Sequence, residues 1–519
     1  MSETASTHAT ERLAPPHRTG GATTPALLPS LEPLLREWLP RQRWFAGKGR
    51  PVTGFQPVSA TEVLPCPGPG GSPGLLHLLI RAEQSGPPQA LGTPDCYQLL
   101  LGVHDTLPPR LASALVGRPR GGPLAGLTVY DALLDPRLCA VLMERLRAPG
   151  RLGALRFHRE AAATVPPGLL ARPLTAEQSN SSVVFGDAYI LKIFRRVSPG
   201  RNPDLELPLT LARAGCGRVP APAAWFEAEP AGAPAAGGGP AAAEEPTTLG
   251  VLQPFLHGSV DGWQLALNAL SVRSDFTAAA RSLGHATAEV HTELARSLPT
   301  VRLRRPQLDA VAAGMTERME ATARAVPALR PYCDGLRRAF DALRDLGGEE
   351  RGWAAQRIHG DLHLGQTLRT GDGRWAVIDF EGEPSRPLAE RRRLEPAVRD
   401  IAGILRSFDY AASSGPSGGD AWSLEWARAT REAYCDGYAE AGGPDPRAVP
   451  ELLRAYETDK AVYEVLYEAR HRPDWLPVPL AAVRRLAAAA GGQSADTVGA
   501  GAPAGVAAPA SPPPTGPAS

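Results

Sequence analysis

The segment from His359 to Gly382 interrupts a long run of predicted helices and carries three polar side chains at defined spacings. Asp361 is followed five positions later by an amide side chain, Gln366, and Asp379 ends the apolar stretch that comes next. A carboxylate such as Asp361 could accept the proton of an attacking hydroxyl. Carboxylate and amide oxygens are also suitable ligands for Mg²⁺ on nucleotide phosphates. The segment therefore predicts a phosphoryl-transfer site that uses ATP, with Asp361 as catalytic base and Gln366 and Asp379 as magnesium ligands.

The spacing of these residues favours one type of fold. The separation of Asp361 and Gln366 equals that in the catalytic loop of protein kinases, H-R-D-x-x-x-x-N, and Asp379-Phe380-Glu381 takes the place of D-F-G. Short apolar runs typical of strands precede about residue 256, and helical periodicity dominates after it. We therefore predict an α+β, bilobal, protein-kinase-like fold, preceded by about 100 additional residues.

The same patterns place individual elements. Strands are predicted at 73–81, 96–103 and Leu155–His158, and a hairpin at Ser182–Phe185 and Tyr189–Phe194. Helices are predicted at Leu31–Leu39, Cys139–Leu146, Pro203–Ala214, 277–297, 307–325, 329–345, 395–411, 421–441, 449–471 and 479–490. The compositions of 1–28, 228–246 and 491–519 predict two disordered tails around a mobile loop that joins neighbouring strands of one sheet.

Composition limits the partners of this chain. A net charge of +1 over 519 residues gives no electrostatic reason to expect nucleic acid or a membrane surface. The six cysteines are scattered singly, which is typical of reduced thiols. The first 28 residues have no signal-peptide pattern, and no apolar run reaches the ~18 residues of a membrane span. We expect a cytoplasmic protein that is a monomer or a homodimer.

Lys192 is the predicted phosphate-binding lysine. It lies inside the apolar strand Tyr189–Phe194, where an ammonium group must pair with an acid or reach a ligand. Glu206, near the start of the predicted helix Pro203–Ala214, is the candidate partner.

Two further segments complete the predicted nucleotide site. Gln178, Ser179, Asn180 and Ser181 occupy the position of a glycine-rich loop and could offer donors to phosphates. The hinge between the lobes is predicted around Val251–Leu256, where backbone groups near Gln253 and Phe255 could bind adenine.

Longer motifs resemble a known family. The H-G-D-L-H-L-G-Q and I-D-F-E-G segments resemble the aminoglycoside-phosphotransferase-like kinases of small molecules, and among these the actinobacterial maltokinases. The stretches that carry this resemblance are Arg43–Lys48, Gln178–Asp187, Leu388–Leu394, Val398–Gly403, Arg406–Ala411, Asp459–Val465 and Tyr467–Arg470.

The resemblance implies an ATP- and Mg²⁺-dependent enzyme that phosphorylates the anomeric hydroxyl of maltose, giving maltose 1-phosphate for α-glucan (glycogen) synthesis. It also points to trehalose synthase as a partner. The domains it implies are a cap subdomain at 29–125, an intermediate β-rich nucleotide-binding subdomain at 126–256 and an α-helical C-lobe at 257–490.

Candidate sugar-binding residues lie in the C-lobe. Lys460 and Tyr463 belong to a helical stripe of polar and aromatic groups, which suits a disaccharide. Asp361, His363, Asp409 and Tyr410 are further candidates for contact with the sugar. Asp400 has a different predicted role, because it could brace the catalytic loop by binding the backbone of that loop.

Two alternatives stay open. The same scaffold could serve another sugar kinase, such as a glucosamine kinase, whose charged acceptor would favour additional carboxylates in the pocket. The chain could also be a non-catalytic, kinase-like nucleotide-binding module. The complete set of Lys192, Asp361, Gln366 and Asp379 argues against that second alternative.

Overall fold

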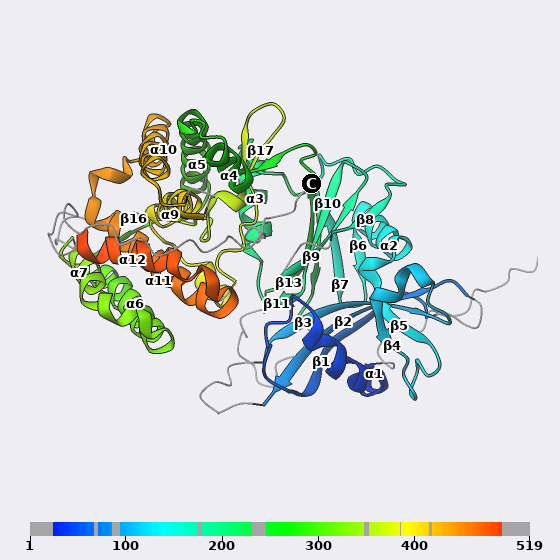
Figure 1. Ribbon diagram of the computed structural model, residues 1–519. Coiled ribbons are helices and arrows are strands. Elements are labelled where there is room, and N and C mark those ends of the chain that lie inside the picture. Colours follow the sequence, from blue (N-terminus) through cyan, green and yellow to red (C-terminus); the bar gives the residue numbers. More distant parts are fainter. Residues whose placement is uncertain are drawn as a thin grey trace, which may run out of the picture.

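The computed structural model describes three structural parts, two of them built on sheets and one on helices (Figure 1). The described residues are 24–66, 71–85, 94–174, 179–230, 245–346, 352–384, 386–414 and 418–489. The predicted α+β, bilobal arrangement with an additional N-terminal part is confirmed. Within the described part of the chain, no helix has the length and apolar character needed to cross a bilayer.

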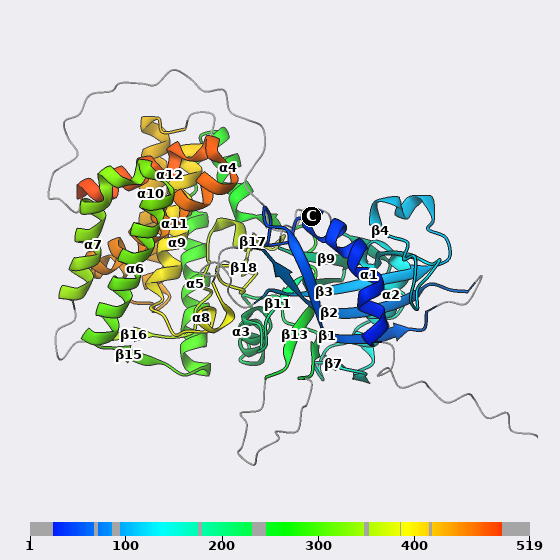
Figure 2. The same ribbon diagram turned by 90° about the horizontal axis from the view of Figure 1, so that it is seen from below.

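The N-terminal cap is a sheet covered on one face by helix α1 (Thr24–Trp38), which lies across the strands in Figure 2. The strand order is β1 (Val52–Leu64), β2 (Gly74–Gln84), β3 (Cys96–His104), β5 (Thr128–Asp131) and β4 (Leu115–Gly117). Both strands predicted here are confirmed, but β1 was not foreseen. Helix α1 begins at Thr24, inside the segment predicted as a tail, and the rest of that tail lies outside the described residues.

The intermediate sheet carries the nucleotide-site residues. Its strand order is β6 (Gly150–Leu152), β7 (Leu155–Arg159), β12 (Ala224–Ala228), β13 (Thr247–Pro254), β10 (Tyr189–Phe194), β9 (Asn180–Phe185) and β8 (Ala171–Pro173). Its helices are α2 (Pro136–Arg147) and α3 (Pro203–Arg213). β12 and β13 pair directly, so 228–246 joins neighbouring strands as predicted, although 231–244 lies outside the described residues.

The cap and the intermediate sheet are joined through the strand that carries Lys192. After β10 the chain continues into β11 (Arg196–Val197), which pairs with β3 of the cap. Between these strands lies Arg195, which is 2% exposed. Its guanidinium contacts Asp131 at 2.6 Å and lies 4.8 Å from the Trp44 ring, and its Nε donates to Ser181 Oγ at 2.8 Å. A buried charge with these contacts fixes the cap against the nucleotide-binding sheet.

The helical half forms the C-lobe. Its helices are α4 (Gly262–Ser271), α5 (Thr277–Ser297), α6 (Arg305–Ala325), α7 (Cys333–Asp345), α8 (Leu388–Arg391), α9 (Val398–Ser414), α10 (Ala421–Glu440), α11 (Pro450–His471) and α12 (Pro477–Ala489). Two small sheets accompany them: β14 (Val260–Asp261) with β17 (Thr367–Arg369) and β18 (Trp375–Val377), and β15 (Val301–Leu303) with β16 (Trp353–Ala355). Helices α5 and α10 pack closely because Gly284 and Gly437 face the backbone of the opposite helix, where a Cβ would come within 2.2 Å and 2.0 Å of carbonyl oxygens.

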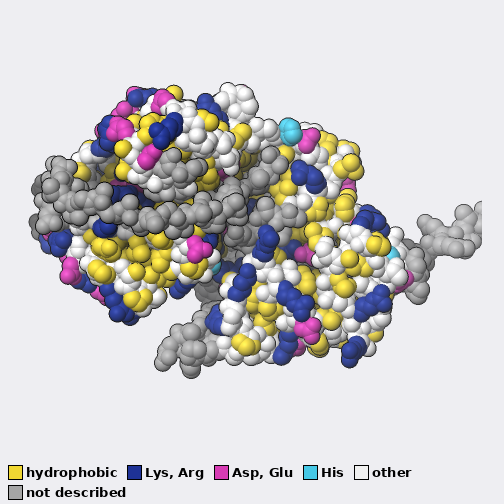
Figure 3. Space-filling model, in the orientation of Figure 1, with side chains coloured by type: hydrophobic (Ala, Val, Ile, Leu, Met, Phe, Trp, Pro, Cys, Tyr) yellow, Lys and Arg dark blue, Asp and Glu magenta, His cyan; other side chains and the backbone are white. Residues whose placement is uncertain are grey.

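On the face shown in Figure 3, basic and acidic side chains are interspersed over both halves. This surface agrees with the near-zero net charge and offers no broad single-sign patch on that face.

Candidate active site

The catalytic loop is held by an acid from helix α9. The carboxylate of Asp400 accepts the backbone N–H groups of His359 and Gly360, each at 2.8 Å, and contacts Nε2 of His291 at 3.1 Å. Burial opposes the charge of Asp400, but the hydrogen bond from His291 keeps the pKa of this carboxyl below its usual value. The predicted bracing role of Asp400 is confirmed.

A second contact joins the catalytic loop to the segment that carries Asp379. His359 donates through Nε2 to the carbonyl of Ile378 at 2.9 Å. The backbone then turns sharply at Asp379, whose φ of 65° lies in the left-handed region that few residues other than glycine adopt. This turn places the Asp379 side chain at the boundary between the two lobes.

Asp361, the predicted base, is paired with a lysine from helix α11. Nζ of Lys460 lies 2.7 Å from Asp361 Oδ1 and 4.8 Å from the centre of the Tyr463 ring. Burial disfavours the ammonium, but Asp361 holds the pKa of Lys460 above its usual value. Within the described residues, no hydrogen bond reaches Asp361 Oδ2. The structure thus brings Asp361, Lys460 and Tyr463 together, as the sequence predicted.

The space beside Asp361 is small in this structure. A cavity of about 20 Å³ is lined by the catalytic loop and by residues of α9 and α11. A larger cavity of about 910 Å³ lies on the outer part of the intermediate sheet, around His158 and Trp225, and its lining contains none of the predicted site residues. The smaller cavity is therefore the one placed next to the chemistry.

Lys192 faces Asp379 and Glu381 of the helical half across the boundary, and Asp204 of helix α3 on its own side. Its Nζ lies 2.8 Å from Asp204, 2.5 Å from Asp379 and 2.7 Å from Glu381. Burial opposes the charge, but these three carboxylates hold the pKa of Lys192 well above its usual value. The central prediction, a sheet-borne lysine opposite the acids of the helical half, is confirmed geometrically.

The predicted pairing of Lys192 with Glu206 is wrong. Asp204 takes that place, and its other carboxylate oxygen accepts the backbone N–H of Phe380 at 2.6 Å. Glu206 lies two residues further along α3, and residues two apart on a helix do not face the same way. Its carboxylate binds Arg357 at 2.7 Å instead.

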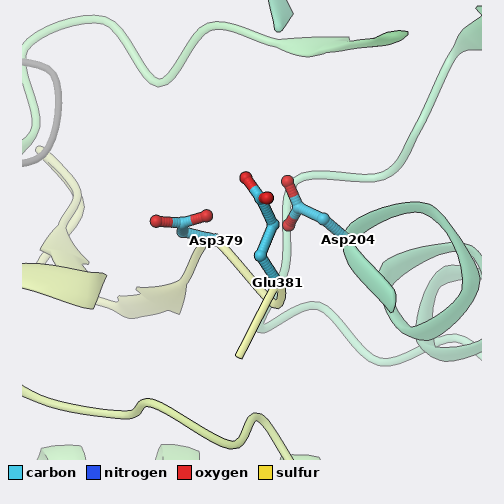
Figure 4. A group of neighbouring side chains, drawn as sticks. All are labelled: Asp204, Asp379 and Glu381. Carbon is cyan, nitrogen blue, oxygen red and sulfur yellow. The ribbon is translucent and has the colours of Figure 1, made fainter. Parts of the chain in front are cut away.

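The acids around Lys192 can accommodate a divalent cation. Oxygens of Asp204, Asp379 and Glu381 lie within 4.8 Å of one another (Figure 4). Gln366 donates through Nε2 to Asp379 at 2.9 Å, while its Oε1 is buried without a hydrogen-bond partner among the described residues. Hard oxygen donors with one unsatisfied acceptor fit Mg²⁺. Asp204 and Glu381 were not predicted for this role, although Glu381 lies inside the I-D-F-E-G motif.

The predicted phosphate-binding loop is only partly as expected. Gln178 lies outside the described residues, and Ser179 is exposed. Asn180 donates to Glu381 at 2.6 Å, so its amide reaches the acidic cluster. The hydroxyl of Ser181 accepts a hydrogen bond from Nε of Arg195 on the cap side, and its contact with phosphate stays a prediction.

The segment predicted as the hinge has most of its backbone groups paired within the protein. Gln253 pairs with Ile190 near the end of β13, where the chain passes to the helical half. The N–H of Phe255 donates to Ala188, and its carbonyl accepts from His257, both at 2.9 Å. Both backbone groups of Phe255 therefore have a partner within the protein, and adenine binding near Gln253 and Phe255 stays a prediction.

Three further candidate sugar-binding residues, His363, Asp409 and Tyr410, have hydrogen-bond or ion-pair partners other than Asp361. Burial lowers the pKa of His363 to about 4, so this ring is neutral near pH 7, and its Nδ1 accepts the N–H of Gly365. The carboxylate of Asp409 contacts Arg406 and Arg431 at 3.3 Å and 3.2 Å, and Tyr410 donates to Glu468 at 2.6 Å. Asp409 and Tyr410 thus join α9 to neighbouring C-lobe helices, and their contact with the sugar stays a prediction. The sequence could not show the contacts with Arg431 and Glu468, because these two partners lie on α10 and α11.

A sheet-borne lysine facing a loop with a catalytic-type aspartate and metal-binding oxygens defines a phosphotransferase of kinase-like fold. Residues 170–452 match the phosphotransferase enzyme family, and the chain belongs to this family. Residues 38–135 match the maltokinase N-terminal cap domain.

Similar proteins include two glucosamine kinases. That of Streptacidiphilus jiangxiensis is 28% identical over 362 residues, which cover 65% of this chain and 78% of that protein. That of Mycolicibacterium smegmatis is 29% identical over 337 residues, which cover 61% and 79%. Solved structures of glucosamine kinase, one in crystal form B and one in complex with glucosamine, ADP and inorganic phosphate, give TM-scores of 0.62 and 0.59. Each is 22% identical and covers 88% of this chain and 98% of the other, which shows a shared fold.

Proposed function

We propose that this protein is an ATP-dependent maltokinase that transfers the γ-phosphate of ATP to the anomeric hydroxyl of maltose, giving maltose 1-phosphate. The match of residues 38–135 to the maltokinase cap domain carries the proposal. The long motifs around Arg43–Lys48 and Asp459–Val465 support it from both ends of the chain.

Asp361 has the geometry of a general base for this reaction. Lys460 occupies Oδ1 and leaves Oδ2 to accept the proton of the sugar hydroxyl. As that oxygen bonds to the terminal phosphorus, the bond from this phosphorus to the bridging oxygen of ADP breaks, and the proton passes to Asp361. Asp400 keeps the loop in place during this step because it holds the backbone on the N-terminal side of Asp361.

The residues proposed to hold Mg²⁺ are Asp379 and Gln366, with Asp204 and Glu381 close by. The metal would neutralise charge on the phosphates. Lys192 would approach the same phosphates from the sheet, since its Nζ already lies among these acids.

The acceptor side favours a neutral sugar. A cationic acceptor that approached Asp361 would bring its ammonium close to Lys460, at a cost from like-charge repulsion. Tyr463 and Tyr467 lie one turn apart on α11, with ring centres 6.2 Å from each other, and supply aromatic faces for the C–H surfaces of sugar rings. These features suit maltose better than an amino sugar.

Glucosamine phosphorylation is the second candidate, because the named relatives that match most of the chain are glucosamine kinases. The experiment that decides measures ADP release with maltose, glucosamine and an aminoglycoside, and identifies the product by phosphorus NMR. Turnover of maltose to a 1-phosphate is the expected result. Turnover of glucosamine without turnover of maltose would refute the maltose assignment and leave a sugar kinase.

A non-catalytic role would be indicated if none of these acceptors released ADP although the protein bound MgATP. We also propose a cytoplasmic location, a monomer or homodimer, and supply of α-glucan synthesis in cooperation with trehalose synthase. Size-exclusion chromatography with light scattering checks the oligomeric state, and co-purification with trehalose synthase checks the partner.

A further inference from the structure

Helix α3 lies between the two halves of the molecule and belongs to both (Figures 1 and 2). Leu205 and Leu209 are fully or nearly buried in the core of the sheet-containing half. Leu207 and Leu211 are fully buried in the core of the helical half. Each pair is spaced by four residues, which places its members on one face of the helix. A movement of α3 would therefore disturb both cores.

The first turn of α3 carries two acids that also point to different partners. Asp204 joins Lys192 and the backbone N–H of Phe380, on the nucleotide side. Glu206 joins Arg357, which lies just before the catalytic loop, with 2.7 Å between Oε2 and Nη1. The helix therefore touches the metal-binding segment through one acid and the catalytic loop through the other.

Arg357 depends strongly on Glu206. The residue is 6% exposed, and its Nε and Nη2 have no hydrogen-bond partner within the described ranges. A buried guanidinium is costly unless it is paired, and Glu206 is the carboxylate that pairs with it among the residues described. The pair therefore fixes the backbone at position 357 relative to α3, four residues ahead of Asp361.

We propose that Glu206 and Arg357 are positioning residues, which hold the catalytic loop in register with the nucleotide-binding side through helix α3. This inference rests on the proposed phosphoryl transfer but not on which sugar accepts the phosphate. Asp204 keeps Lys192 beside Asp379, and the pair keeps Asp361 at a fixed distance from them. Phosphoryl transfer depends on this alignment because the attacking and leaving oxygens must lie in line.

The variant Glu206→Gln tests the proposal, since it removes the charge and keeps the size. We expect kcat to fall by about 10²-fold, as for a misplacement of about 1 Å, while the Kd for MgADP changes by less than about threefold. The matched control is Glu160→Gln. Glu160 forms an exposed ion pair with Arg213 at the other end of α3, and the substitution removes its charge. The control should keep the wild-type kcat within about twofold.

Two further measurements separate positioning from a loss of stability. Arg357→Lys keeps the charge but loses the planar fork, so kcat should fall without a matching loss of MgADP affinity. The exchanged pair Glu206→Arg with Arg357→Glu should recover at least about tenfold in kcat over Glu206→Arg alone. An unchanged kcat in Glu206→Gln would overturn the proposal. So would parallel losses of kcat, melting temperature and MgADP affinity that the exchanged pair does not recover.

The kinetics use whichever of maltose and glucosamine the wild type phosphorylates, so a wrong sugar assignment leaves the test intact. Hydrogen–deuterium exchange gives a readout that needs no sugar. MgADP should slow exchange in peptides spanning 357–366 of the wild type, and Glu206→Gln should lose this protection while still binding MgADP. Equal protection in both proteins would contradict the coupling even if neither sugar were a substrate.

Discussion

The replacement of Asp204 by Asn is the sharpest test of the nucleotide site, because the sequence pointed to Glu206 instead. The Asp204 carboxylate accepts two donors, Lys192 at 2.8 Å and the N–H of Phe380 at 2.6 Å. An Asn side chain has one acceptor oxygen and one donor amide at this place, so one of the two hydrogen bonds must be lost.

The size of the effect follows from these contacts. A hydrogen bond that involves a charged group contributes about 1.5–3 kcal/mol, and a tenfold change in rate corresponds to about 1.4 kcal/mol. We therefore expect Asp204→Asn to lower kcat/KM for ATP by about tenfold to about 150-fold. The loss should appear in steady-state assays of ADP release at saturating sugar.

Asp445→Asn is the matched control. Asp445 also accepts a backbone N–H and a cationic side chain, here the N–H, Nε and Nη2 of Arg447, but it lies on the surface of the C-lobe. Its replacement should leave kcat/KM for ATP within about twofold. If Asp204→Asn behaves like this control while Glu206→Gln weakens MgADP binding, then the assignment of Asp204 as the partner of Lys192 is mistaken.

Three further outcomes test the site and the fold. Asp361→Asn should lower the transfer rate by at least about 10²-fold and leave MgADP affinity within about threefold, and a near-normal rate would contradict its role as base. Asp379→Ala should abolish the Mg²⁺ dependence of nucleotide binding in calorimetry with and without the metal, so persistent dependence would argue against this ligand. Burial lowers the pKa of His77 from 6.5 to about 4. As the pH falls, the unfolded chain therefore takes up this proton before the folded protein does. The free energy of unfolding should fall by about 3 kcal/mol between pH 6.5 and pH 4 as a result. His77→Asn should flatten that part of the curve of unfolding free energy against pH, and an equally steep curve would show that other groups cause the loss.

The sequence predicted those parts of the fold in which periodicity is regular. Helix α5 begins and ends at the predicted residues 277 and 297, and the β9–β10 hairpin turns where Gly186 allows a positive φ of 57°. Strand β1 was missed because it contains Gly54 and Pro57 and pairs with β2 through register shifts, which obscure any simple alternation.

The site was predictable where one motif holds neighbouring residues, and less so where distant elements meet. Asp361, Gln366 and Asp379 follow from local spacing, and Lys192 follows from its strand. The choice between Asp204 and Glu206 depends on the rotation of α3, which is set where the helix begins after its N-cap Asn202. No pattern within α3 itself shows which of its faces meets the sheet.

The distribution of charge across the site gives a reason for the two lysines. A phosphoryl group that leaves ATP keeps its negative charge on the way to a neutral hydroxyl, so cationic groups are useful at both ends of its path. Lys192 provides such a group on the nucleotide side, and Lys460, 2.7 Å from Asp361, provides one on the acceptor side. Before substrate arrives, each ammonium is balanced by acids of the site, which lowers the cost of keeping it buried. When the sugar hydroxyl binds at Oδ2 of Asp361, Lys460 stays beside Oδ1, and its remaining N–H groups could donate to the incoming phosphoryl oxygens. On this reasoning Lys460→Met should reduce kcat more than it raises KM for the sugar, and the opposite pattern would assign Lys460 to sugar binding alone.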